Sequence, residues 1–358
     1  MSGGSSSDRP GITAREVEPV VAPEGCTPEE LARDERFWTR VASRSPTTPG
    51  IVNLENGYYG IMPAPVRQAY LTNMDRLNES NSYLLRTSYK AELEDIGRKL
   101  ELAAMAGAAV LDTYARALHD HPRVGLLLLS HMNNRTGLVV PVREVVAMAA
   151  QRGSGRDRRC RAFLGTTRFH HSRSGGADFV GFSLHKWINA PLGAGFLYIR
   201  RERLGDIDLA FGDEIYPADD IRSRVHSGTS DAATFLTVDT ALDCHAELGA
   251  SVEQARLRRL RNHWVDRVRH IDNIEILTPE DPSMYAAITS FRISGRASQG
   301  DDEAIVRYLL EKYGIFTVRR GGVDHGDCVR VTPAQFTLIE HVDRPADALP
   351  DVARRFRA

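Results

Sequence analysis

The chain has 358 residues, enough for a deep hydrophobic core and, by its size, for two domains. Its 46 Lys and Arg against 47 Asp and Glu leave a formal net charge of −1, which gives no general attraction to nucleic acid or to anionic membranes. No apolar run approaches the length of a membrane span, the first residues show no secretory core, and the 4 cysteines form no CxxC pair. We therefore expect a cytoplasmic protein of enzyme size, with free thiols and without nucleic-acid or membrane partners.

The N-terminal part of the chain changes character along its length. Residues 1–26 are rich in Gly, Ser and Pro without periodicity, which is typical of a disordered tail. Thr27 with Glu30 then predicts a capping box at the start of a helical segment over 27–49. The string "IVNLENGYYGIM" predicts a short extended piece that ends in a glycine turn, and residues 64–106 predict mostly helix.

The rest of the chain divides into two predicted units. From 124 to 200 the order is strand, helix, an arginine-rich run and two strands, which is typical of an α/β domain whose mostly parallel sheet is flanked by helices. After a long basic helix, three strands and two helices predict a small α+β C-terminal domain. We place the large domain over 50–245 and the small domain over 246–358.

The string "FSLHKWINAPLGAGFLYIRR" carries the most chemistry. Lys186 follows a strand and precedes a Pro/Gly turn, so we expect its amine at a strand end, where open α/β sheets bind ligands. A lysine with a lowered pKa can form a Schiff base there, and Ser183 and His185 beside it could hold a phosphate. For a bare His-Lys pair, an ordinary exposed lysine would be the better interpretation.

The whole string, however, resembles the class V aminotransferase family of pyridoxal-phosphate (PLP) enzymes, in the branch around isopenicillin N epimerase and the cysteine desulfurases. The resemblance implies a PLP-dependent transferase fold of type I, with PLP as cofactor on a Schiff base with Lys186. It implies that Ser183 and His185 contact the phosphate of PLP. Asn134, in "SHMNNRTGLVVPVREV", matches the residue that hydrogen-bonds the ring hydroxyl of the cofactor.

Three further motifs carry the resemblance, in the family's order. "RVHSGTSD" matches the segment whose Gly228 and Thr229 reach the phosphate of the neighbouring subunit, which implies a homodimer. "VRVTPAQFTLIEHVDR" matches the motif whose arginine, here Arg330, grips the α-carboxylate of the substrate. "LENGYYG", with Asn56 and Gly57, matches the segment that lines the substrate mouth.

The resemblance implies PLP chemistry at the α-carbon of an amino acid, by an epimerase or an aminotransferase. The alternatives are a C–S lyase that acts on a cysteine conjugate and a non-catalytic scaffold of the same fold. A persulfide-forming desulfurase is disfavoured because the loop "RRGGVDHGD" has no cysteine, and Cys328 on a predicted strand is better explained as structural. We expect no metal site, and we interpret the basic helix after residue 250 as solvated rather than RNA-binding.

The chain departs from the family pattern at two places. After Gly107 a single helix precedes the next strand, so roughly 60 residues, or two βαβ units, are missing together with the phosphate-binding turn that they carry. The second departure is the run over 153–176, "GSGRDRRCRAFLGTTRFHHSRSGG", where the family has a buried strand. The family's Asp for the pyridine nitrogen falls on Arg159, which would weaken the cofactor as an electron sink and impair activity.

The 6 arginines of this run argue against a buried strand, so we expect an irregular, extruded segment that leaves a gap in the sheet. Residues 156–166 can be encoded so that a reading one base later gives V-I-V-D-A-A-H-S-W-G-Q. Our hypothesis is a compensated frameshift, and an arginine-rich insertion is the alternative. Codons that cannot be shifted into V-D-A-A-H would exclude the frameshift.

Overall fold

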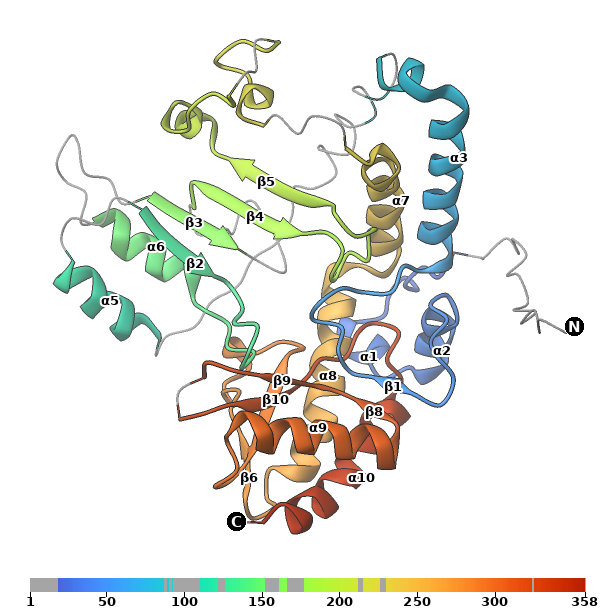
Figure 1. Ribbon diagram of the computed structural model, residues 1–358, viewed down its shortest axis with the longest axis vertical. Helices are drawn as coiled ribbons and strands as arrows, with labels where there is room; N and C mark the ends of the chain where they lie inside the picture. Colours follow the sequence, from blue (N-terminus) through green and yellow to red (C-terminus); the bar gives the residue numbers. More distant parts are fainter. Residues whose placement is uncertain are drawn as a thin grey trace, which may run out of the picture.

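A computed structural model describes residues 19–86, 89, 92, 110–121, 126–151, 161–165, 177–211, 215–225, 230–323 and 325–357. Within these ranges the chain forms two four-stranded sheets and one two-stranded sheet. Figure 1 shows one four-stranded sheet in the upper half of the molecule and the other in the lower half, with the long helix α8 (Ala250–Val268) running down from the first toward the second. None of the described helices is both long and apolar enough to cross a membrane.

The upper sheet has the order β2-β3-β4-β5. Its strands are β2 (Leu126–Ser130), β3 (Arg161–Gly165), β4 (Phe179–Ser183) and β5 (Gly195–Ile199). The first three run parallel, whereas β5 is antiparallel to β4. Helices α5 (Val110–Asp120) and α6 (Val142–Gln151) pack on it, because Leu129 and Val180 of the sheet bury against Val145 of α6. The predicted mostly parallel sheet flanked by helices is confirmed.

The expectation of a gap in this sheet is wrong. Strand β3 lies within the arginine-rich run and pairs with β2 along its whole length and with β4 from position 163 onward. The physical reason is that a strand between two parallel neighbours needs only a few residues with free backbone groups, and the "RAFLG" stretch between the arginines contains no proline. The rest of the run, including Arg159, lies outside the described residues.

Two long helices stand beside the upper sheet. Helix α3 (Ala64–Arg86) packs along α7 (Ala232–Leu248), and the two lie side by side at the right of Figure 1. Val66 of α3 and Val238 of α7 share a buried cluster with Leu184 from the end of β4. Gly249, with φ 80°, separates α7 from α8 and lets the chain turn downward. Leu184, directly after β4, is therefore packed against α3 and α7.

The lower sheet is antiparallel and has the order β6-β7-β10-β9. Its elements and the adjoining ones are β6 (Ile274–Ile276), β7 (Thr289–Ile293), α9 (Gln299–Tyr313), β8 (Ile315–Phe316), β9 (Val318–Arg320), β10 (Cys328–Val331) and α10 (Ile339–Arg355). Trp264 of α8, Phe291 of β7 and Leu349 of α10 belong to one buried core. This agrees with the predicted α+β character, although β6 was not predicted and the strand "GIFTVRR" is divided into β8 and β9.

The basic helix α8 is only partly solvated, so its interpretation as a solvated face is wrong in part. Arg256 and Arg261 are fully buried. Arg256 donates two hydrogen bonds to the carboxylate of Glu35, at 2.6 and 2.8 Å, and lies over the ring of Trp38. Arg261 lies over the ring of Tyr285. Paired carboxylates and aromatic faces make these burials tolerable, which a charge pattern alone does not reveal.

The N-terminal segment is ordered earlier than expected. Val20 is buried in a cluster with Trp38 and Leu248, although residues 19–26 were expected to be disordered. The predicted capping box of Thr27 and Glu30 is confirmed at α1 (Pro28–Leu31), and α2 (Glu35–Ser43) begins after its own cap, Asp34. Three short 3-10 helices complete the described elements: η2 (Arg201–Asp206), η3 (Ile221–Arg224) and η4 (Pro282–Met284).

The chain after α2 then crosses to the lower sheet. Strand β1 (Val52–Asn53) pairs in parallel with β8, and Glu55 forms a bridge with Thr332 just beyond β10. This crossing places the "LENGYYG" segment between the end of β4 in the upper sheet and Arg330 in the lower one. The two halves of the molecule therefore meet along it.

Candidate active site

Lys186 lies in the turn that follows β4, as predicted. The turn is closed by backbone hydrogen bonds from Ala190 N to Leu184 O at 3.2 Å and from Asn189 N to Lys186 O at 3.3 Å. Asn189 adopts φ 56°, a conformation that non-glycine residues take only when their surroundings impose it. The Lys186 side chain is half-buried, and burial, followed by the positive charge of Arg330, lowers the pKa of its amine.

The two neighbours predicted to hold a phosphate flank this lysine. Ser183 is the last residue of β4, and His185 is half-buried. Burial first, and the charge of Lys186 second, lower the pKa of His185, so its ring is mainly neutral at pH 7. Its Nδ1 is buried and has no hydrogen-bond partner among the described residues. Such an atom is suited to a ligand that supplies the missing partner.

Arg330, on β10, is 1% exposed and gathers several predicted site residues. Its Nη1 donates to the backbone carbonyl of Asn134 at 2.6 Å, and its Nη2 donates to the carboxylate of Glu55. A Cβ on Gly57 would lie 2.8 Å from Nη2, so the absence of a side chain lets the backbone approach the guanidinium. Asn134, Gly57 and Arg330, far apart in sequence, therefore meet.

Two charged residues that sequence reasoning missed complete this cluster. Glu55 is half-buried, with 8% of its side chain exposed, and its Oε1 accepts from Arg320 Nη2 at 2.9 Å as well as from Arg330. The other oxygen, Oε2, is buried without a partner among the described residues. The signals available were an acidic residue directly before Asn56 and a second arginine beside Arg319. Neither indicates by itself a pair that is 265 residues apart.

The "LENGYYG" segment (54–60) also contacts the lysine turn. Gly60 N donates to His185 O at 2.7 Å. A Cβ on Gly60 would lie 1.9 Å from Asn189 Oδ1 and 2.4 Å from Lys186 O, so only glycine permits this approach. Asn56, predicted at the substrate mouth, is buried, and its amide donates to Thr332 O at 2.9 Å. In this structure Asn56 thus anchors the segment to the lower sheet.

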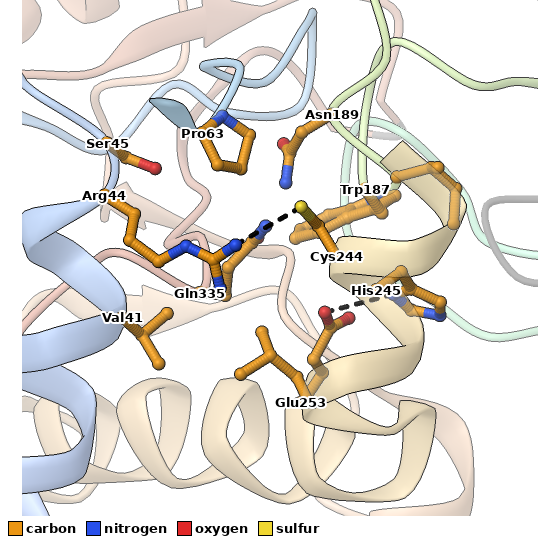
Figure 2. A pocket seen from close by; sticks show the side chains of 12 residues that line it. Val41, Arg44, Ser45, Pro63, Trp187, Asn189, Cys244, His245, Glu253 and Gln335 are labelled. Carbon is orange, nitrogen blue, oxygen red and sulfur yellow. Dashed lines mark hydrogen bonds and ion pairs between the residues drawn. The ribbon is translucent and has the colours of Figure 1, made fainter. Parts of the chain in front are cut away.

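A small pocket lies behind the lysine turn and supports it. Figure 2 shows Trp187 and Asn189 of the turn lining one side, with Arg44 reaching across toward Cys244. Arg44 donates to Cys244 Sγ at 3.3 Å and pairs with Glu247 at 2.6 Å. The room inside is about 20 Å³, which suits a single water molecule. The pocket is therefore too small for a substrate, and the residues that line it pack against the lysine turn.

Not every predicted residue can be placed. Asn134 is exposed, and its backbone carbonyl, rather than its side chain, accepts the hydrogen bond from Arg330. Gly228 and Thr229 lie outside the described residues. Their roles, like those of Asn56, Ser183 and His185 toward a cofactor, stay predictions. What the structure brings together is a lysine with a lowered pKa, a buried arginine and the glycine-rich segment that touches both.

The fold is similar to those of solved structures. The structure matches that of the cysteine desulfurase CsdA from Escherichia coli with a TM-score of 0.68, at 16% identity, over 89% of this chain and 98% of that one. It also matches the cystine C–S lyase C-DES with a TM-score of 0.64, at 20% identity, over 85% of this chain and 98% of that one. The fold is that of the type I PLP-dependent enzymes.

The sequence then gives the family. The family model of class-V aminotransferases matches residues 91–329. The chain therefore belongs to the class-V aminotransferase family. It is 26% identical over 328 residues to an isopenicillin N epimerase of Streptomyces clavuligerus, which covers 84% of this chain and 73% of that protein.

Proposed function

We propose that the chain is a PLP-dependent enzyme that acts at the α-carbon of an amino acid, by epimerisation or amino transfer. The observation that carries the proposal is the placement of Lys186, a half-buried amine after a strand end whose pKa is lowered by burial and by Arg330. Membership of the class-V aminotransferase family and the likeness to isopenicillin N epimerases support the same function.

The residues around the turn fit PLP. An amine with a lowered pKa is unprotonated more often, so Lys186 is suited to hold the aldehyde carbon of the cofactor. The unpartnered, buried Nδ1 of His185 offers a polar contact for the phosphate, and Ser183 offers a hydroxyl nearby in sequence. We further propose Asn134 at the ring hydroxyl, and Gly228 and Thr229 at the phosphate held by a second subunit of a homodimer.

Residues of the chain itself would bind the substrate and transfer the proton at its Cα. When bound, PLP supplies an electron sink for the charge that forms at Cα of an amino acid. Arg330 would bind the α-carboxylate, which fixes the direction of the Cα–H bond. The amine of Lys186 would take the proton from Cα and return it, a task for which a lowered pKa is suited. Because Arg330 is almost fully buried with Gly57 against it, residues around Gly57 must move before a carboxylate reaches the guanidinium.

C–S lysis of a cysteine conjugate is the second candidate. The likeness to a cystine C–S lyase structure supports it at the level of the fold. A persulfide-forming desulfurase is less well supported, because the loop over 319–327 contains no cysteine. Cys328 is fully buried in β10, and burial raises the pKa of its thiol, which makes it a poor nucleophile. A non-catalytic scaffold is the third candidate, since Arg159 replaces the family's Asp.

Titration of the purified protein with PLP, followed by visible absorbance, tests the proposal. The wild type and Lys312→Ala, which changes an exposed lysine paired with Asp351, should develop the same saturable band. Lys186→Ala should not develop the band of a Schiff base with the protein, and borohydride should leave no pyridoxyl group on it. A wild type that gives only the absorbance of free PLP would support the scaffold instead. Sulfur release from L-cystine by the loaded wild type would favour the lyase over the epimerase.

A further inference from the structure

Two arginines share one carboxylate at the centre of the site. Arg320 Nη2 lies 2.9 Å from Glu55 Oε1, and Arg330 Nη2 donates to the same oxygen. We propose that Glu55 and Arg320 determine the substrate class: they admit amino acids with one carboxylate near Cα and exclude short dicarboxylic amino acids such as aspartate and glutamate. This inference rests on the proposed function, which puts the α-carboxylate on Arg330.

The charge of the cluster matches one carboxylate. Arg320 and Arg330 contribute two positive charges and Glu55 one negative charge, which leaves a net charge of +1. Of the five N–H groups of Arg330, one donates to Asn134 O and one to Glu55, while its Nε has no partner among the described residues. A single carboxylate could accept two of the three remaining N–H groups of Arg330, and it would neutralise the cluster.

A second substrate carboxylate would lack a free cation, because Arg320 is already paired with Glu55. Arg320 lies beside Arg330, because both donate to Oε1 of Glu55, and after burial the charge of Arg330 lowers the pKa of Arg320. The carboxylate of Glu55 lies between the two arginines, where the side-chain carboxylate of aspartate or glutamate would have to lie. In addition, Glu55 Oε2 is buried without a donor among the described residues, so it would repel another anion with little screening.

The backbone keeps Glu55 in this place. Glu55 N donates to Asn53 Oδ1 at 2.8 Å, and Glu55 forms a bridge with Thr332. Thr332 N donates to Leu54 O at 2.7 Å, so the residues on both sides of the bridge are tied to the lower sheet. By contrast, the side chains of Tyr58 and Tyr59 are exposed. A movement confined to residues 57–59 would therefore leave intact the hydrogen bonds that keep Glu55 between the arginines.

Calorimetric titration of the purified full-length protein with propionate and with succinate tests the inference without a bound cofactor. The measured quantity is the preference for succinate, which is the dissociation constant for propionate divided by that for succinate. Glu55→Gln should raise this preference by about tenfold or more, because it exposes Arg320 to the second carboxylate. Glu311→Gln, the same charge change on the exposed face of α9, should leave it unchanged. Glu55→Gln/Arg320→Met should return it to the wild-type value.

A second variant keeps the test decisive if Glu55→Gln does not fold. In Arg320→Met, Glu55 neutralises Arg330 alone, so the affinity for propionate should fall by about tenfold. An unchanged preference in folded Glu55→Gln, unchanged propionate binding in Arg320→Met, or a wild type that binds no propionate would each overturn the inference. Failure of the proposed function is seen separately, as the absence of a PLP band that depends on Lys186.

Discussion

Gly60→Ala is the smallest change that should disturb the lysine turn. The added Cβ would lie 1.9 Å from Asn189 Oδ1 and 2.4 Å from Lys186 O, more than 1 Å inside ordinary contact, and the second atom is backbone. Since Asn189 is 2% exposed and its backbone is held at φ 56° within the same turn, its amide has little room to withdraw. Either the segment over 54–60 or the lysine turn must shift. Overpacking of this kind costs about 1–3 kcal/mol of unfolding free energy.

The change should impair function as well as stability. A shift of the turn by about 1 Å displaces the amine of Lys186 from the guanidinium of Arg330, and misplacements of this size cost about 100-fold in rate. Urea unfolding gives the stability, and PLP titration gives the affinity for the cofactor. The matched control is Gly205→Ala, because nothing lies within 4 Å of its Cβ position. Equal stability and equal PLP affinity for the two variants would refute the interpretation of this contact.

Two further outcomes follow from the structure, and a third follows from the proposed homodimer. Asp302 is fully buried, and burial, followed by the charge of Asp327, raises its pKa to about 7, so the folded state keeps a proton that the unfolded state loses near pH 4. The unfolding free energy of the wild type should therefore fall between about pH 4 and 7, and Asp302→Asn should be more stable by about 2–4 kcal/mol at pH 8 but not at pH 4; parallel pH profiles in urea unfolding would contradict this. Arg256→Met should cost about 3 kcal/mol, because it leaves Glu35 partly buried without its closest partner, whereas Arg259→Met, whose Nε lies 3.9 Å from the same carboxylate, should cost less than about 1 kcal/mol; equal thermal shifts would argue against the buried pair. Light scattering at micromolar concentration should give the mass of a dimer, and a monomer would contradict the proposed sharing of the site between subunits.

The sequence predicted the parts of the site that are local. Lys186 could be placed because an apolar strand before it and a Pro/Gly turn after it fix its position at a strand end. Arg330 could be placed because it stands on a strand within a family-like string. The capping box of Thr27 and Glu30 needed only residues three apart. In each case the information lies within a few neighbouring residues.

What could not be predicted depends on contacts across the fold. Glu55 and Arg320 meet only because β1 pairs with β8 and the segment after β1 then follows β10. The close approach of Gly60 to Asn189 depends on the packing of two loops, and no spacing in the sequence encodes it. The arginines of α8 were interpreted as solvated because their partners, Glu35 and Tyr285, belong to other elements.

The arginine-rich run shows the limit of reasoning from side chains alone. Its arginines predicted a gap in the sheet, yet residues 161–165 pair with both neighbouring strands. Backbone hydrogen bonds offered by β2 and β4 on either side favour a strand at this place whichever residues precede it. The prediction weighed the cost of buried charge for the whole run, although only five of its residues are needed for the strand.

We propose that Lys186 is the lysine that holds PLP. Reduction of the PLP-treated protein with borohydride fixes the cofactor to its lysine, and peptide mapping then identifies the labelled residue. We expect a single pyridoxyl label on Lys186, and no such label in Lys186→Ala. A label on Lys90 or Lys312 instead, or no label at saturating PLP, would contradict it.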